Sequence, residues 1–147
     1  MRYFFPFTLL LFSGCLGMPK GVSPVRDFSV KRYLGTWYEI ARLDHPFERG
    51  LTNVTATYSL RRDGGVRVVN RGWSSKQNRW KKAVGRAYFV DTKTRGHFKV
   101  TFFWPFYGSY VIFDLDPNYS IAYVSGDTTR YLWLLSRTPT LSAEAVS

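Results

Sequence analysis

Short segments in which apolar and polar residues alternate, separated by closely spaced turn residues, constrain this 147-residue chain most strongly. One such segment alternates apolar Val54, Ala56, Tyr58 and Leu60 with polar Thr55, Thr57, Ser59 and Arg61. Successive side chains of a β-strand point to opposite faces, so this period of two predicts a strand with one apolar face. Asp63-Gly64-Gly65 follows, and glycine permits the positive φ of a tight hairpin turn. The pattern predicts strands joined by short turns.

Eight candidate strands can be counted along the chain. They begin near Thr36, Asn53, Val66, Arg79, His97, Ser109, Tyr119 and Arg130. The sequence shows no internal repeat and no convincing long helix. Eight meandering strands suffice to close a barrel that holds one small ligand. We therefore predict an all-β protein, an eight-stranded antiparallel up-and-down β-barrel, over residues 25–137.

Closure of the barrel would send one alternating set of side chains inward. We expect the ligand-binding residues to be Ala56, Tyr58, Phe89, Phe98, Val100, Phe102, Tyr110 and Trp133. Aromatic walls with a few hydroxyl groups suit an acyl chain with one polar head. In the alternative interpretation, the same aromatic side chains simply fill the barrel. Residues 43–51 would form a long first loop, either a lid over the mouth or an ordinary loop.

The chain has a Gly-x-Trp sequence at the first predicted strand and an arginine just after the last one. The residues are Gly35, Trp37 and Arg137. An indole and a guanidinium brought together at the end of a barrel can stack, which is worth roughly 0.5–2 kcal/mol. Gly35 would let the backbone turn tightly where a Cβ would collide. The alternative is a core tryptophan and an unrelated surface arginine.

This pairing and the sequence around it closely resemble the bacterial outer-membrane lipocalins, which are lipoproteins. The similarity is carried by residues 31–42, 44–51, 54–60, 102–108 and 131–140, and it extends over almost all of residues 25–142. The resemblance implies a lipocalin barrel that binds fatty acids or lysophospholipids, for lipid storage or transport in the cell envelope. It also implies that Gly35, Trp37 and Arg137 form a structural motif.

The amino terminus is typical of a lipoprotein signal. Residues 1–14 combine a basic start with an apolar stretch that is shorter than the ~20 residues a membrane-spanning helix needs. Phe12-Ser13-Gly14-Cys15 resembles a lipobox, with Phe12 where leucine is usual, so Cys15 is predicted to be lipidated. The alternative is an incidental or buried cysteine. Residues 15–24 would be a lipidated tether, and Leu16 in place of aspartate implies the periplasmic side of the outer membrane.

The chain is strongly basic, with a formal net charge of +11. The excess is concentrated in residues 61–86, where Asp63 is the only acidic residue. Such a stretch attracts polyanions, and Trp73 and Trp80 could stack on nucleic-acid bases. A periplasmic protein meets anionic lipid or lipopolysaccharide instead, so we expect no nucleic-acid partner. The remaining alternatives are a merely solvated surface, or a filled, non-enzymatic barrel whose basic face binds lipopolysaccharide or a protein.

Catalytic and metal-binding motifs are absent from the sequence. His45 and His97 have no HExxH or cysteine partner, and no nucleophile elbow or phosphate-binding loop occurs. We therefore predict a binding protein that is not an enzyme and uses neither a cofactor nor a metal.

The last ten residues depart from the pattern that the resemblance implies. Lipocalins continue into an amphipathic helix that packs outside the barrel, and residues 138–147 look like its truncated start, with Ser142 as N-cap. We expect Ile40, Leu132 and Leu134 to be left as an exposed patch, with a possible homodimer to cover it.

Overall fold

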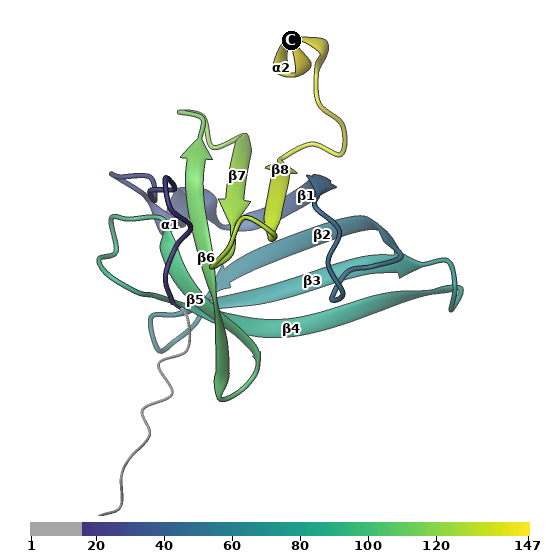
Figure 1. Cartoon of the computed structure of the whole chain (residues 1–147), viewed down its shortest axis with the longest axis horizontal. Helices are drawn as coiled ribbons and strands as arrows, with labels where there is room; N and C mark the ends of the chain where they lie inside the picture. The colour runs from purple at the N-terminus through teal and green to yellow at the C-terminus, as the bar shows by residue number, and fades with distance from the viewer. Residues whose placement is uncertain (1–15) are drawn as a thin grey trace, which may run out of the picture.

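Eight antiparallel strands close into a barrel in the computed structural model, which describes residues 16–147 (Figure 1). The strands are β1 (Gly35–Arg42), β2 (Leu51–Leu60), β3 (Val66–Ser74), β4 (Arg79–Phe89), β5 (His97–Phe103), β6 (Phe106–Leu115), β7 (Ile121–Ser125) and β8 (Leu132–Ser136). Each pairs with the next along the chain, and β8 pairs with β1. The predicted all-β, up-and-down barrel is confirmed. The predicted signal peptide and Cys15 lie outside the described residues.

Two single-turn helices accompany the barrel. Helix α1 (Val30–Tyr33) precedes β1, and α2 (Ala143–Val146) follows β8. Neither helix in residues 16–147 is long and apolar enough to span a bilayer. Ser142 caps α2 as predicted, because its hydroxyl accepts a bond from the Ala145 amide at 3.3 Å. Helix α2 projects away from the barrel (Figure 1).

One end of the barrel is closed by the segment that leads into β1. Phe28 is buried there, with its ring centroid 5.4 Å from that of Tyr33 and 5.7 Å from that of Phe98. Tyr33 on α1 is buried as well, and its carbonyl accepts a 2.8 Å hydrogen bond from the indole Nε1 of Trp37. These aromatic contacts plug the closed end.

The first and last strands are clamped together beside this plug. The Arg137 guanidinium carbon lies 4.0 Å from the centroid of the fully buried Trp37 ring. The guanidinium also donates to the carbonyls of Arg32, Thr36 and Tyr119. Gly35 has a φ of +98°, and a Cβ there would lie 3.2 Å from Nη1 of Arg137. The glycine therefore leaves room for the guanidinium of Arg137, which a Cβ would crowd.

The strands separate toward the opposite, open end. β1 pairs with β2 only from Gly35 to Tyr38, and β4 pairs with β5 only from Arg86 to Phe89. The remainder of β4 stays paired with β3, so a long β3–β4 hairpin extends from the barrel (Figure 1). This divergence leaves the interior accessible from one end.

The outer face of the barrel is better covered than expected. Ile40, Leu132 and Leu134 are half-buried, so the prediction that they form an exposed patch is wrong. Ile40 lies at the irregularity where β1 and β8 shift register, and Leu132 and Leu134 lie on the closely paired β8. On β5, Thr101 is out of phase with the cavity-lining residues and is nevertheless buried.

Candidate functional site

A cavity of about 760 Å³ occupies the barrel and reaches the open end. Seven of the eight side chains expected at a ligand site line it: Ala56, Tyr58, Phe98, Val100, Phe102, Tyr110 and Trp133. The apolar wall is completed by small and branched residues such as Val66, Val68 and Ala87. The cavity argues against the alternative in which aromatic side chains fill the barrel.

Phe89 is the one expected residue that does not line the cavity. It lies at the end of β4, with its ring centroid 4.4 Å from that of Phe98 and 6.4 Å from that of Phe28. Alternation alone places Phe89 inward, but Phe28 occupies the closed end of the barrel. Phe89 therefore packs around this plug.

Three tyrosine hydroxyls meet deep in the barrel. The Tyr110 hydroxyl lies 2.7 Å from that of Tyr33 and 2.9 Å from that of Tyr58. Burial raises the pKa of all three phenols above the ordinary value, so they stay neutral. Each hydroxyl therefore has a hydrogen-bond partner without a ligand. Two hydrogen bonds use only two of the three O–H donors, so one O–H is not engaged within the cluster.

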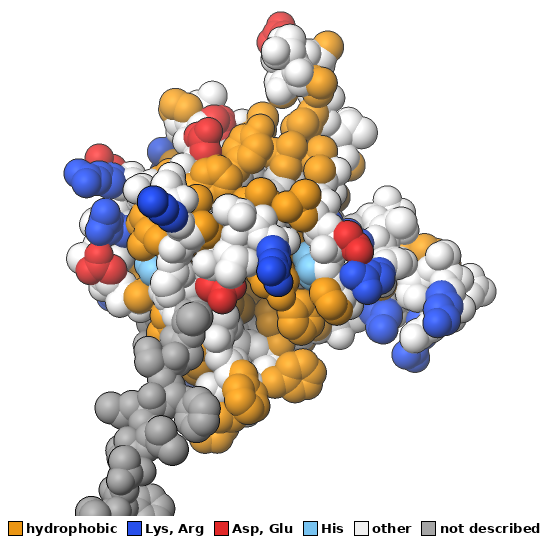
Figure 2. All heavy atoms as spheres, viewed as in Figure 1, with side chains coloured by type: hydrophobic (Ala, Val, Ile, Leu, Met, Phe, Trp, Pro, Cys, Tyr) orange, Lys and Arg blue, Asp and Glu red, His pale blue; other side chains and the backbone are white. Residues whose placement is uncertain are grey.

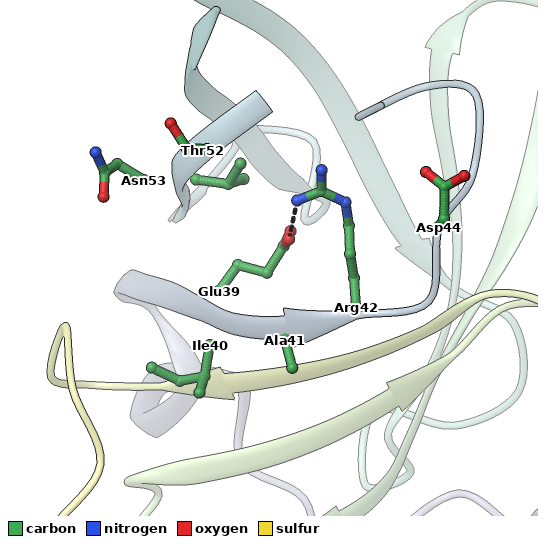
Figure 3. A pocket seen from close by; sticks show the side chains of 8 residues that line it. Glu39, Ile40, Ala41, Arg42, Asp44, Thr52 and Asn53 are labelled. Carbon is green, nitrogen blue, oxygen red and sulfur yellow. Dashed lines mark hydrogen bonds and ion pairs between the residues drawn. The ribbon is translucent and has the colours of Figure 1, made fainter. Parts of the chain in front are cut away.

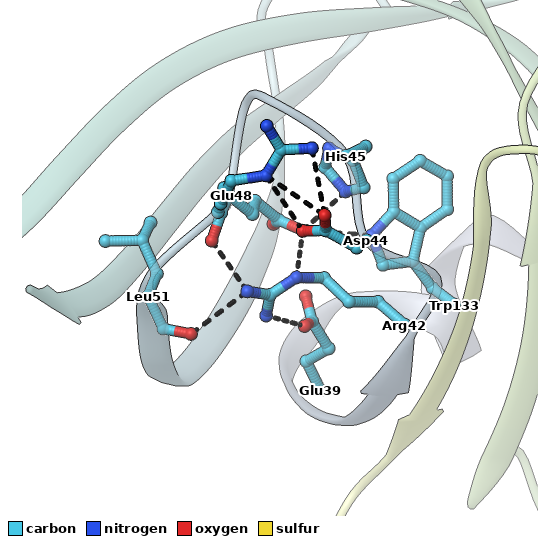
Figure 4. A network of polar contacts seen from close by, with 8 residues as sticks. Glu39, Arg42, Asp44, His45, Glu48, Leu51 and Trp133 are labelled. Atoms are coloured by element: carbon cyan, nitrogen blue, oxygen red, sulfur yellow. Dashed lines mark hydrogen bonds and ion pairs between the residues drawn. The ribbon is translucent and has the colours of Figure 1, made fainter.

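A network of charged side chains lies at the mouth, where the β1–β2 loop (residues 43–50) covers part of the opening (Figure 4). Oε2 of Glu48 accepts a 3.1 Å hydrogen bond from the Trp133 indole and lies 3.0 Å from Nε2 of His45. His45 is buried, and its ring packs edge-on against Trp133 at 5.3 Å. The loop is thus attached to the barrel wall.

Arg42 joins this network to β1. Its Nη1 donates to Glu39 at 2.6 Å, and its Nη2 donates to the carbonyls of Glu48 and Leu51 at 2.6 and 3.1 Å. The guanidinium therefore bridges the gap that opens where β1 leaves β2. A second, smaller cavity of about 400 Å³ lies beside this gap (Figure 3).

Glu39 is placed to change charge near neutral pH. Burial, together with the negative charge of Glu48, raises its pKa to about 7, although the Arg42 guanidinium opposes the shift. A ligand headgroup that enters the mouth therefore meets the carboxyl groups of Glu39 and Glu48, of which Glu39 changes charge near neutral pH.

This network could be predicted from the sequence only in part. Glu39 lies two residues from Trp37 on β1, so period-two alternation already placed it inward. For His45 and Glu48 the sequence offers no comparable signal, because they lie in a loop with no repeating pattern. Their meeting with Trp133 depends on how that loop folds back across the barrel.

The basic stretch forms no single cluster. Arg61 pairs with Asp63, and the Arg71 guanidinium lies 4.2 Å from the centroid of the Trp80 ring. Lys81 and Lys82, by contrast, are exposed on β4 at the rim of the cavity. Within residues 16–147 no group of three or more histidine, cysteine or acidic side chains is arranged to hold a metal ion.

Comparison with known proteins agrees with this architecture. The lipocalin-like domain family matches residues 28–147. The chain is 62% identical over 133 residues to the outer membrane lipoprotein Blc of Vibrio cholerae, covering 90% of this chain and 78% of that protein. It is 56% identical over 126 residues to the outer membrane lipoprotein Blc of Escherichia coli K12, covering 86% and 71%. Insecticyanin from the tobacco hornworm Manduca sexta shares the fold at 19% identity, with a TM-score of 0.71 over 88% of this chain and 74% of insecticyanin.

Proposed function

Because this chain belongs to the lipocalin family, and its relatives are outer membrane lipoproteins that bind ligands and are not enzymes, we propose that it binds fatty acids or lysophospholipids in its barrel. The observation that carries the proposal is the open apolar cavity of about 760 Å³. Pockets for small molecules measure about 300–1,000 Å³ and combine apolar walls with a few polar groups.

The arrangement of polar groups supports one orientation of the ligand. The acyl tail runs inward along Val68, Val100 and Phe98, where burial of apolar surface stabilises it. The head remains at the mouth, where Lys81 and Lys82 provide positive charge for a carboxylate or phosphate. In this proposal the β1–β2 loop closes over the head, and its attachment to Trp133 through Glu48 holds the closed position.

We further propose that Cys15 carries the lipid anchor that holds the protein at the periplasmic face of the outer membrane. The support is the lipobox-like sequence at residues 12–15 and the homology to outer membrane lipoproteins. Acyl chains contribute about 0.8 kcal/mol per buried CH₂, and two or more of them give stable attachment. A protein held in this way has a supply of lipid beside its cavity, which suits storage or transport.

A cavity-filling substitution tests the binding proposal. Ala56 lines the cavity on β2, whereas its neighbour Thr55 is on the outer face of the same strand. Ala56→Phe should weaken binding of palmitate and lysophosphatidylcholine at least tenfold, and the control Thr55→Phe should leave it within twofold. Quenching of the tryptophan fluorescence, followed by titration, measures the affinity.

Three outcomes would overturn the proposal. If neither lipid perturbs the fluorescence of the wild-type chain, or if lipid does not appear in native mass spectra of protein purified from its own membrane, the cavity does not serve lipid. Equal affinity of the wild type and a folded Ala56→Phe variant would place any bound lipid outside the barrel. In that case the basic surface becomes the better candidate for the binding site.

A further inference from the structure

The tyrosine cluster deep in the barrel has one more proton donor than its own hydrogen bonds use. Tyr33, Tyr58 and Tyr110 come from α1, β2 and β6, and all three line the cavity. Their hydroxyls are joined by two hydrogen bonds, of 2.7 and 2.9 Å. Each phenol carries one O–H and can also accept, so these two bonds engage two of the three protons. The third can be donated to an oxygen atom of a ligand.

Tyr110 presents this cluster to the cavity. Tyr33 and Tyr58 are buried, with 3% and 7% of their surface exposed, whereas Tyr110 is half-buried and pairs with the cavity-lining Phe98 on β5. Tyr110 is also the middle member, because both hydrogen bonds of the cluster involve its hydroxyl. The phenols can exchange donor and acceptor roles, so the cluster can donate to a ligand oxygen or accept from a ligand O–H at the same place.

The barrel wall beside the cluster is apolar. The strand register places Val68 of β3 and Gly85 of β4 level with Tyr58. Val66 and Ala87 pair with each other one layer closer to the closed end. A hydroxyl buried against such a wall without a hydrogen bond is strongly unfavourable. The cluster therefore offers a ligand oxygen a partner at a depth where the neighbouring strands offer hydrocarbon.

The cluster lies well below the cations at the mouth of the cavity. Lys82 is three residues from Gly85 on β4, so about 10 Å of strand separates this lysine from the level of Tyr58. Figure 2 shows lysine and arginine side chains along the projecting β3–β4 hairpin. A ligand whose acidic head is held at Lys81 and Lys82 therefore meets the cluster with the far end of its tail. An ordinary acyl chain ends there in a methyl group, which cannot form the hydrogen bond.

We propose that the tyrosine cluster is a binding subsite for the far end of an acyl chain that carries a neutral oxygen there, as an ω-hydroxyl or a carbonyl group. This inference rests on the proposed function, with the acidic head at the mouth and the tail inside. A carboxylate at the far end does not suit the subsite, because its charge would lose its hydration. The Arg137 guanidinium cannot replace that hydration, since it is engaged with the Trp37 ring and three backbone carbonyls.

Pairs of ligands that differ by one oxygen test this inference. Hexadecanoate is compared with ω-hydroxyhexadecanoate, and dodecanoate with its ω-hydroxy derivative, by titration of the whole chain. A purely apolar pocket would bind each hydroxy acid much more weakly than its parent, since the buried hydroxyl would have no partner. We expect the wild type to bind at least one hydroxy acid as tightly as its parent acid.

Replacing the cluster should reverse this preference. The triple variant Tyr33→Phe, Tyr58→Phe and Tyr110→Phe keeps the three rings and removes every hydroxyl of the subsite. We expect it to bind that hydroxy acid at least tenfold more weakly than the wild type does, and the parent acid within twofold. Tyr131→Phe, which removes a hydroxyl at the mouth, is the matched control and should leave the ratio of the two affinities unchanged. If the triple variant does not fold, Tyr58→Phe with Tyr110→Phe replaces it and leaves only the buried hydroxyl of Tyr33.

A carbonyl probe reports the hydrogen bond directly. In the infrared spectrum of a bound fatty acid with a ketone beside its terminal methyl group, the ketone stretching frequency should be lower in the wild type than in the phenylalanine variant. An equal frequency in both proteins, or a ratio of affinities that the phenylalanine variant leaves unchanged at both chain lengths, would overturn the inference. If hexadecanoate still binds in that case, the proposed function stands. Failure of the wild type to bind any of these acids would instead overturn the proposed function.

Discussion

The indole of Trp133 on β8 and the carboxylate of Glu48 in the β1–β2 loop are joined by a 3.1 Å hydrogen bond across the mouth of the barrel. Trp133 is part of the cavity wall, and Glu48 belongs to the loop that covers it. One side of this bond is therefore fixed and the other is on a segment without regular structure. The bond couples the position of the loop to the state of the cavity wall.

Trp133→Phe should loosen this loop. The change removes the only nitrogen donor of the ring and leaves Glu48 with His45 and Arg42, so the loop loses about 1–2 kcal/mol of attachment. We expect amide hydrogen exchange in residues 44–51 to accelerate roughly tenfold, with the barrel strands unaffected. Trp73→Phe on β3 is the matched control. Unchanged exchange would show that packing of His45, and not this bond, holds the loop.

Glu39→Gln should change how stability depends on pH. The pKa of Glu39 is about 7 in the folded state against an ordinary 4.5, so the folded state holds the proton more tightly. Its stabilising contribution is complete below pH 4.5 and is lost as the pH rises through 7. We expect the wild type to lose on the order of 1–2 kcal/mol relative to Glu39→Gln across that interval, allowing for solvent screening. Urea unfolding at several pH values measures this loss of stability, and the exposed substitution Glu144→Gln is the control. Parallel pH profiles of stability for the wild type and Glu39→Gln would contradict the prediction.

Arg137→Ala should destabilise the barrel more than a surface arginine would. It removes the stack on Trp37 and three hydrogen bonds to backbone carbonyls, for an expected loss of about 2–4 kcal/mol. Arg137→Lys should recover less than half of this, because an ammonium cannot reproduce the planar fork. Thermal and chemical unfolding measure the loss. Arg130→Ala, at an exposed position, is the control. If it lowers the free energy of unfolding as much as Arg137→Ala does, the clamp is not what closes the barrel.

Cys15→Ser should abolish acylation of the protein in its cell. We expect either a soluble periplasmic form or an unprocessed precursor, because serine cannot form the thioether that carries the diacylglycerol. Globomycin, which blocks cleavage of lipoprotein signals, should make the wild-type precursor accumulate. Membrane fractionation that does not change with Cys15→Ser would rule out the lipid anchor.

Neutralising Lys81, Lys82 and Arg86 together should flatten the salt dependence of binding to anionic vesicles. Interactions between exposed charges are screened over about 8 Å at physiological ionic strength, so wild-type binding should fall steeply as salt is raised. Vesicle sedimentation of the non-acylated chain measures the slope. Three cations at the closed end, Lys31, Lys93 and Arg95, provide the matched control. Equal slopes for both triple variants would mean that the charge acts without regard to position.

The barrel could be predicted from the sequence because its signal is local and repeated. The turn at Asp63-Gly64-Gly65 and the alternation along β2 each require only neighbouring residues. Inward placement followed from the same alternation, and seven of the eight expected residues line the cavity. Their contact with a ligand remains a prediction.

The remaining features depend on contacts between segments that lack a period. Phe28 plugs the closed end from an irregular segment and displaces Phe89 from the cavity lining. The loop that carries His45 and Glu48 folds back on Trp133, and no pattern in the loop sequence predicts this contact. Half-burial of Leu132 and Leu134 depends on how closely strands pack around the whole circumference. Such contacts require the three-dimensional arrangement.

The clamp between Trp37 and Arg137 has a consequence for how such a protein can evolve. The contacts that clamp the first strand to the end of the last are at the closed end, whereas the rim elements that surround the cavity are at the other. Residues 43–50 and 103–106 can therefore vary in length and chemistry while the same scaffold continues to assemble around them. A new specificity requires a new rim and no new fold, for natural selection and for the protein engineer alike.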